Sequence, residues 1–183
     1  AGLAESLKAF AEAISRSQIL MIPGGFSAGD EPDGSGKFIA AIMKSPIVRD
    51  ATMELLKSRD GLALGICNGF QVLVESRLLP GGLIRNEHQH FVCRDQRLRV
   101  ENTGTAWTNL FEQDEEITIP LKNAEGGYIA SADTIKMLEA EKPDLVSVCP
   151  RHLDQHHMVA IRQNRQTVND GAEAARGQLR HRI

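Results

Sequence analysis

Cysteine is scarce in this 183-residue chain, and the few cysteines lie far apart. They are Cys67, Cys93 and Cys149, and none of them belongs to a CxxC motif. An odd number of widely spaced cysteines argues against a disulfide framework and against a zinc site built from cysteines. A reducing, cytoplasmic location is therefore expected.

A strong excess of charge and a long apolar run are also missing. The net charge is −3, which gives no electrostatic reason to bind nucleic acid or an anionic membrane surface. No apolar run approaches the ~20 residues that a membrane span requires, and the N-terminus lacks the layout of a signal peptide. We therefore expect no nucleic-acid partner and no membrane association.

Short apolar runs and helical patterns alternate through the first half of the chain. The expected helices cover about residues 3–18, 37–59 and 68–79, the second being interrupted near Pro46. The expected strands are "ILMI" at 19–22 and "GLALGIC" at 61–67. Because both strands are apolar on both faces and alternate with helices, the pattern predicts a parallel α/β sheet covered by helices.

The pattern changes in the second half. Residues 90–102 and 116–122 read as strands of an antiparallel or edge portion of the same domain, and 131–142 reads as a helix. Residues 151–183 contain no aromatic residue and no lysine, and few of them are apolar. We therefore expect a partial domain at 1–150 and an atypical tail at 151–183, poorly packed or disordered.

A cysteine lies between two glycines where the second predicted strand meets a helix. Gly65, Cys67 and Gly69 form a G-x-C-x-G pattern, which is typical of a nucleophile displayed on a sharp strand–turn–helix elbow. Glycines are needed there because side chains would clash with the neighbouring strand and helix. A helix N-terminus also favours the thiolate, the reactive form of cysteine. A buried core cysteine beside two accidental glycines is the alternative.

The first predicted strand ends in "PGGFS", residues 23–27. A strand that ends in Pro-Gly-Gly can bring backbone N–H groups close to a reacting carbonyl. Together with the N–H of Asn68, they would form an oxyanion hole, in which each donor is worth about 3 to 4 kcal/mol. A plain turn at the end of a strand is the alternative.

Four segments together resemble one known family: "MIPGGFSAGDEPDGSGKF", "LALGICNGFQVL", "LLPGGLIRNEHQHFVCRDQRLRVENTGTAWTNLF" and "IPLKNAEGGY". They are similar to the class I glutamine amidotransferase domain of phosphoribosylformylglycinamidine synthase, over about residues 3–148. The resemblance implies a flavodoxin-like α/β fold of three layers with a mostly parallel sheet, here incomplete at both ends. It also implies that the domain hydrolyses glutamine and passes ammonia to a synthase subunit or fused synthase domain of de novo purine biosynthesis.

The resemblance also assigns roles to residues. Cys67 becomes the catalytic nucleophile, and the N–H groups of Gly25 and Asn68 become the oxyanion hole. Substrate binding is assigned to the set Gly24, Phe26 and Gln71. No metal and no cofactor is implied for this domain, since ATP and Mg are used by the synthase partner. Arg85 and Asn86 are interpreted as part of a structural or partner-facing surface.

The chain also departs from the family pattern. The family takes its general base from a C-terminal "PHPER"-like segment that follows "NPNGS", and neither segment occurs here. The nearest match, His152 with Asp154, comes too early in the chain. The "HGEG"-like motif of the family appears as "NAEG" at 123–126, without its histidine, and the family's first strand would precede Ala1.

Histidines elsewhere give no metal site. His88 and His90 lie in a polar loop and His156 and His157 in the tail, without further ligands at compatible spacing, so exposed histidines are expected.

Three hypotheses therefore stay open. The first is an active glutaminase component of the synthase. The second is a catalytically impaired module that lacks the His-x-Glu base and still docks on a synthase. The third is a related hydrolase with a cysteine elbow and a different third triad member. The segments "RVENTGTAWTNLF" and "GGFSAGDEPDG" favour the purine enzyme over the third, and the missing base separates the first two.

Overall fold

A computed structural model describes residues 2–25, 36–100, 102–140 and 158–162 of the chain. The described helices are α1 (Leu3–Arg16), α2 (Lys37–Lys44), α3 (Pro46–Lys57), α4 (Asn68–Glu75) and α5 (Ala132–Ala140). The described strands are β1 (Ile19–Ile22), β2 (Leu62–Ile66), β3 (Gly82–Ile84), β4 (Val92–Arg99), β5 (Glu116–Asn123), β6 (Gly127–Ile129) and β7 (Met158–Arg162). Among the described residues, no helix is both long enough and apolar enough to cross a membrane.

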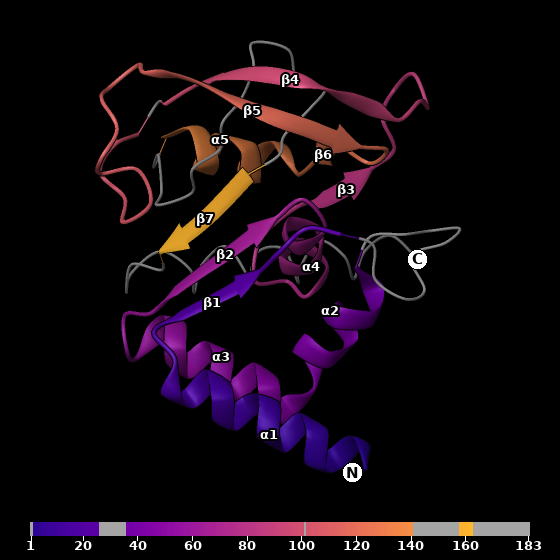
Figure 1. Cartoon of the computed structure of the whole chain (residues 1–183), viewed down its shortest axis with the longest axis vertical. Coiled ribbons are helices and arrows are strands. Elements are labelled where there is room, and N and C mark those ends of the chain that lie inside the picture. The colour runs from indigo at the N-terminus through magenta and orange to yellow at the C-terminus, as the bar shows by residue number, and fades with distance from the viewer. Residues whose placement is uncertain (1, 26–35, 101, 141–157, 163–183) are drawn as a thin grey trace.

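The strands form three small sheets. In the first, β1 pairs with β2 in parallel and β2 pairs with β7 in antiparallel orientation. The other two are antiparallel pairs, β3 with β6 and β4 with β5. In Figure 1, α1 and α3 lie at one end of the molecule and the β4–β5 pair at the other, with β1 and β2 between them. The predicted α/β class is confirmed, and parallel pairing is described for β1 with β2.

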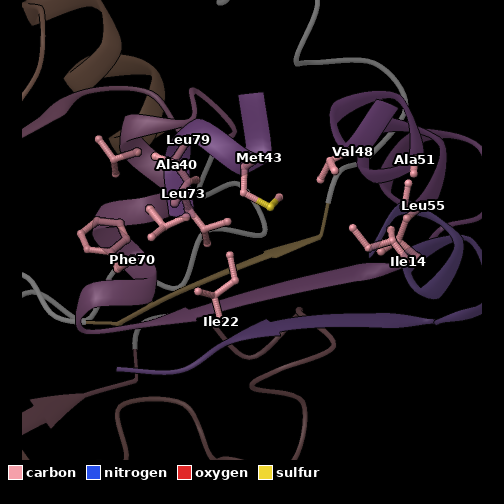
Figure 2. Close-up of a cluster of buried hydrophobic side chains, with 13 residues drawn as sticks. Ile14, Ile22, Ala40, Met43, Val48, Ala51, Leu55, Phe70, Leu73 and Leu79 are labelled. Atoms are coloured by element: carbon pink, nitrogen blue, oxygen red, sulfur yellow. The ribbon is translucent and has the colours of Figure 1, made fainter. Parts of the chain in front are cut away.

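The helical region (residues 3–79) contains the main apolar core. Helices α1 to α4 pack on one face of β1 and β2, where they enclose a cluster of buried side chains (Figure 2). Its members include Ile14, Ile22, Met43, Val48, Leu55, Phe70 and Leu73. Burying a side chain of this size contributes about 1.5 to 3 kcal/mol, so this cluster is a main source of the stability that holds α4 against β1.

The predicted interruption at Pro46 is confirmed, and its cause is local. Helix α2 ends at Lys44, and α3 begins with Pro46 as its first residue. Proline suits the first helical position because its missing N–H has no helical acceptor there. Ser45 between the two helices is extended, with φ −61° and ψ 137°, as is favoured for a residue that precedes proline.

The strand region (residues 82–129) has a different interior. Its buried apolar side chains among the described residues are Leu98, Val100 and Leu121. Its buried polar residues are Asn86, Thr105, Thr108 and Asn123. Hydrogen bonds therefore carry more of the packing here than in the helical region. The two strands predicted near 90–102 and 116–122 are present as β4 and β5 and are antiparallel, as expected.

Two expectations differ from the structure. Strand β1 was expected to be buried on both faces, but Ile19 and Met21 are 51% and 55% exposed. Because successive side chains of a strand alternate between its faces, Ile19 and Met21 lie on the face opposite Leu20 and Ile22, which pack in the apolar cluster. The segment 158–162 was assigned to a poorly packed tail, yet it forms β7 on β2. The remaining residues of that tail lie outside the described ranges, so the boundary at 150 stays a prediction.

Candidate active site around Cys67

Cys67 occupies a sharp turn between a strand and a helix. Strand β2 ends at Ile66 and α4 begins at Asn68, so Cys67 is the N-cap residue of α4. Its backbone has φ 54° and ψ −110°, a conformation that L-residues rarely adopt. A residue held in such a region costs about 1 to 3 kcal/mol and persists only where its surroundings impose it. The predicted strand–turn–helix elbow is therefore present.

The packing around the elbow leaves no room for a side chain at the two glycines that flank Cys67. A Cβ atom on Gly65 would lie 2.6 Å from the carbonyl oxygen of Gly69. A Cβ atom on Gly69 would overlap the carbonyl oxygen of Ile22, at the end of β1. Helix α4 can therefore lie close to both strands only when these positions lack side chains. This close packing holds Cys67 in its strained conformation.

The loop that follows β1, which is predicted to contribute to the oxyanion hole, also lies against the cysteine. A Cβ atom on Gly24 would lie 3.0 Å from the Cβ atom of Cys67 and 3.8 Å from its Sγ atom, so the backbone after β1 runs directly beside the thiol. Gly25 follows with φ 143° and is exposed. Asn68 is the first residue of α4, whose first N–H groups point out of the helix N-terminus. The oxyanion roles of Gly25 and Asn68 stay predictions, and Phe26 lies outside the described residues.

Gln71 lies one helical turn after the nucleophile, and its side chain is held from two sides. The Asn68 side-chain amide donates to Gln71 Oε1 at 3.1 Å. Gln71 Nε2 donates to Glu125 Oε2 at 3.3 Å. The amide of Gln71 is thereby oriented between the helix and a carboxylate from the strand region. Its predicted role in substrate binding has a defined geometry but stays a prediction.

The segment that faces the elbow, residues 122–126, joins β5 to β6; we call it the facing segment. Cys67 Sγ donates a hydrogen bond to the carbonyl oxygen of Lys122 at 3.5 Å. Glu125 of the same segment accepts the hydrogen bond from Gln71. The "NAEG" sequence at 123–126, identified above as a family motif without its histidine, therefore lies at the site.

Asn86 anchors the facing segment. The Asn86 side chain is only 2% exposed, although its interpretation from sequence was a structural or partner-facing surface. Its Nδ2 group donates to the carbonyls of Asn123 at 3.2 Å and His90 at 2.9 Å, and its Oδ1 atom accepts from Gly126 N–H at 2.8 Å. The surface interpretation was wrong for Asn86, because a buried amide can satisfy several backbone groups at once. Arg85 is exposed.

Two contributors to the site, Glu125 and the Lys122 carbonyl, were not identified from the sequence. A backbone carbonyl has no sequence signature. The signal for Glu125 was its place in the "NAEG" motif, which was interpreted only for its missing histidine.

Neither of the two histidines with described positions is hydrogen-bonded to Cys67. His88 and His90 are exposed, and their rings stack with centroids 5.8 Å apart. No group of three or more His, Cys, Asp or Glu side chains suited to a metal ion occurs within the described ranges. His152, Asp154, His156 and His157 lie outside those ranges, so no geometry tests their proposed roles.

Comparison with known proteins defines the class. Residues 3–164 match the family described as the CobB/CobQ-like glutamine amidotransferase domain. Because this match covers most of the chain, the protein belongs to that family of glutamine amidotransferase domains. The resemblance inferred from the four sequence segments is thus confirmed.

Individual relatives show which kind of glutamine amidotransferase the chain resembles. The subunit PurQ of phosphoribosylformylglycinamidine synthase is 50% identical to this chain over 123 residues in Streptomyces avermitilis and 51% over 122 residues in Leifsonia xyli subsp. xyli. Each alignment covers 67% of this chain and 50% of the relative, so the chain spans about half the length of the curated relatives it matches. A chain in the structure of PurLQS from Thermotoga maritima is 38% identical, with a TM-score of 0.54, over 63% of this chain and 52% of that one.

Proposed function

We propose that this chain hydrolyses glutamine through Cys67 and supplies ammonia for phosphoribosylformylglycinamidine synthesis in de novo purine biosynthesis. The observation that carries the proposal is the strained elbow: Cys67 has φ 54° at the N-terminus of α4, between glycines that the packing requires. The membership in the amidotransferase family and the identity to PurQ subunits support the substrate.

In the first step, the Cys67 thiolate attacks the side-chain amide carbon of glutamine. The carbonyl π electrons move to oxygen, and the resulting oxyanion is stabilised by the N–H groups proposed at Gly25 and Asn68. The C–N bond then breaks and the nitrogen takes a proton from the conjugate acid of the general base. Ammonia leaves, and a γ-glutamyl thioester remains on Cys67.

In the second step, water attacks the thioester while the base accepts its proton. The second oxyanion collapses, the C–S bond breaks, and glutamate and the free thiol are released. In this proposal Gln71, whose side chain bonds to Asn68 and Glu125, holds the substrate. Among the described residues, the hydrogen-bond partner of the Cys67 sulfur is the Lys122 carbonyl, and a backbone carbonyl cannot act as the general base.

The partner in this proposal is a synthase subunit or a fused synthase domain that consumes the ammonia with ATP and Mg. The domain itself needs no cofactor for thioester chemistry. We place this activity in the cytoplasm, in accord with the free thiols of Cys67 and Cys93.

The second candidate is a docking module that no longer hydrolyses glutamine. It is favoured by one observation, the absence of a histidine partner for Cys67 within the described residues. Since a nucleophile and its base act as a unit, loss of the base lowers turnover by several orders of magnitude even when the thiol is in place.

Glutaminase turnover separates the two candidates. The full chain is assayed with and without the synthase subunit, next to Cys67→Ala and the matched variant Cys93→Ala, whose exposed thiol lies on β4. We expect Cys67→Ala to lower turnover by about 10⁴-fold or more and Cys93→Ala to leave it unchanged. Turnover no higher than that of Cys67→Ala, with binding to the synthase retained, would establish the docking module instead.

A further inference from the structure

Few interactions with the elbow hold the facing segment (residues 122–126) beside Cys67. It links two small antiparallel pairs, β4–β5 and β3–β6, and contributes two polar contacts to the elbow. These are the Lys122 carbonyl at 3.5 Å from Cys67 Sγ and the Glu125 carboxylate at 3.3 Å from Gln71 Nε2. The first two residues of the segment are also held by the β4–β5 ladder, in register with Cys93 and Val92. Residues 124–126 lie between the strands and need a further constraint, because ordering each backbone residue costs about 1 to 2 kcal/mol.

Asn86 supplies the missing constraint. It follows β3 directly, and β3 pairs with β6, which begins at Gly127 just after the facing segment. This pairing brings the Asn86 side chain underneath the segment. The side chain then bonds to both ends of the turn, donating to the Asn123 carbonyl and accepting from Gly126 N–H. The Asn86 backbone N–H adds a bond of 2.9 Å to the Ala124 carbonyl.

We propose that Asn86 is a positioning residue, which holds the facing segment against the elbow and so sets the surroundings of the Cys67 thiol and of Gln71. The consequence for glutamine recognition rests on the proposed function. The consequence for the thiol does not, because the contact between the Lys122 carbonyl and the sulfur does not involve substrate.

Because Asn86 is buried, its replacement is expected to affect the facing segment directly. Replacing Asn86 by alanine removes one acceptor and two donor contacts at a site that is 2% exposed. The lost bonds to the Asn123 carbonyl and the Gly126 N–H are buried, and the one to the His90 carbonyl is partly buried. Leaving such groups unsatisfied is more costly than the loss of an exposed hydrogen bond, so the segment is expected to move toward water. Movement would withdraw Glu125 from Gln71, whereas Lys122, which is paired with Cys93 in the β4–β5 ladder, would shift less.

The test uses the full chain with Cys93→Ser and Cys149→Ser, so that Cys67 is its remaining thiol. Two electrophiles report on Cys67: 6-diazo-5-oxonorleucine, which must be recognised as glutamine, and iodoacetamide, which is small and needs no recognition. Deuterium uptake at Gly126 reports the facing segment directly. The variants are Asn86→Ala and the shape-preserving Asn86→Asp, which keeps an acceptor for Gly126 and loses both donor contacts.

Thr105→Val is the matched control. Thr105 is 1% exposed in the same strand region, and its hydroxyl bonds to Thr108 at 2.7 Å, away from the facing segment. We expect Thr105→Val to lower the melting temperature and to leave the ratio of the two labelling rates unchanged. This control separates a loss of stability from a change at the site.

For Asn86→Ala, we expect faster deuterium uptake at Gly126, iodoacetamide labelling that is equal or faster, and labelling by the glutamine analogue that is about tenfold slower. Should alanine prevent folding, Asn86→Asp is expected to lower the same ratio of labelling rates. An unchanged ratio, or two rates that shift together as in Thr105→Val, overturns the proposal. If the unmutated protein shows no preference for the glutamine analogue, the proposed function fails instead. The positioning role is then decided by uptake at Gly126 and by the iodoacetamide rate.

Discussion

The helical region and the strand region of this protein are held together by different forces. In the helical region, α1 to α4 enclose an apolar cluster against β1 and β2, whereas the strand region has Leu98, Val100 and Leu121 as its described buried apolar side chains and relies on buried Asn and Thr. The candidate site lies where the two regions meet, with Cys67 on one and the facing segment on the other. Dense apolar packing can impose backbone strain, as at Cys67, and buried hydrogen bonds can fix a turn, as in the facing segment. Each region therefore contributes to the candidate site the kind of constraint that its own interior can provide.

The largest expected effect comes from the crowded elbow. Gly69→Ala is expected to lower the free energy of unfolding by about 3 kcal/mol or more, because the new Cβ atom would overlap the Ile22 carbonyl oxygen. Denaturant unfolding measures the loss. Gly82→Ala in β3 is the matched control, since its Cβ atom would meet nothing closer than Ile129 Cγ1 at 3.5 Å. Similar losses for the two variants would contradict the claim that crowding is specific to the elbow.

The second effect compares the two interiors directly. Leu73→Ala, at a side chain with 0% exposure in α4, is expected to cost about 3 kcal/mol, because a rigid apolar cluster surrounds the cavity. Leu121→Ala, at a side chain with 1% exposure in β5, is expected to cost about 2 kcal/mol, because the β4–β5 pair can relax around the gap. Both values come from denaturant unfolding. A greater loss for Leu121→Ala would show that the strand region is the more rigid of the two.

The smallest effect concerns the contact between β6 and the end of the helical region. Tyr128 Oη donates to the Pro80 carbonyl at 2.9 Å, and burial raises the pKa of Tyr128 from 10.0 to about 12. Tyr128→Phe is expected to cost about 1 kcal/mol near neutral pH, measured by denaturant unfolding.

The pH dependence of this contact has a definite sign. Because the folded-state pKa of Tyr128 is raised, its contribution is fully present below pH 10.0 and is lost as the pH rises toward about 12. The difference in stability between the unmutated protein and Tyr128→Phe should therefore shrink above about pH 10. Tyr128 is the single tyrosine of the chain, so phenolate absorption in the folded protein gives its pKa without ambiguity. A midpoint near the ordinary tyrosine value would contradict the effect of burial.

Much of the fold was predictable because its signals are local. The alternation of apolar runs with helical patterns identified β1, β2 and the helices around them, and Pro46 marked the break between α2 and α3. Antiparallel pairing of β4 and β5 was also expected from their partial alternation. The exposure of Ile19 and Met21 was not predictable, since apolarity on both faces of a strand does not show which faces the described chain covers.

The candidate site was predictable only in part. Glycine spacing revealed the Cys67 elbow, because crowding at Gly65 and Gly69 leaves a direct mark on the sequence. The burial of Asn86 gave no such mark, since asparagine is mostly an exposed residue. Its contacts extend to Asn123 and Gly126, and no local pattern at Asn86 indicates so distant a partner.

The sequence by itself determined the α/β class, the family and the position of the Cys67 elbow with the glycines on either side of it. The class and the elbow follow from periodicity and glycine spacing, which act within a few residues of the chain, and the family follows from the resemblance of four segments. Only the tertiary structure decided that the Lys122 carbonyl and Glu125 face the elbow, and that a buried Asn86 holds them there. That arrangement depends on pairing β3 with β6 and β4 with β5, and the hydrogen bonds of these pairs join residues that are distant in sequence.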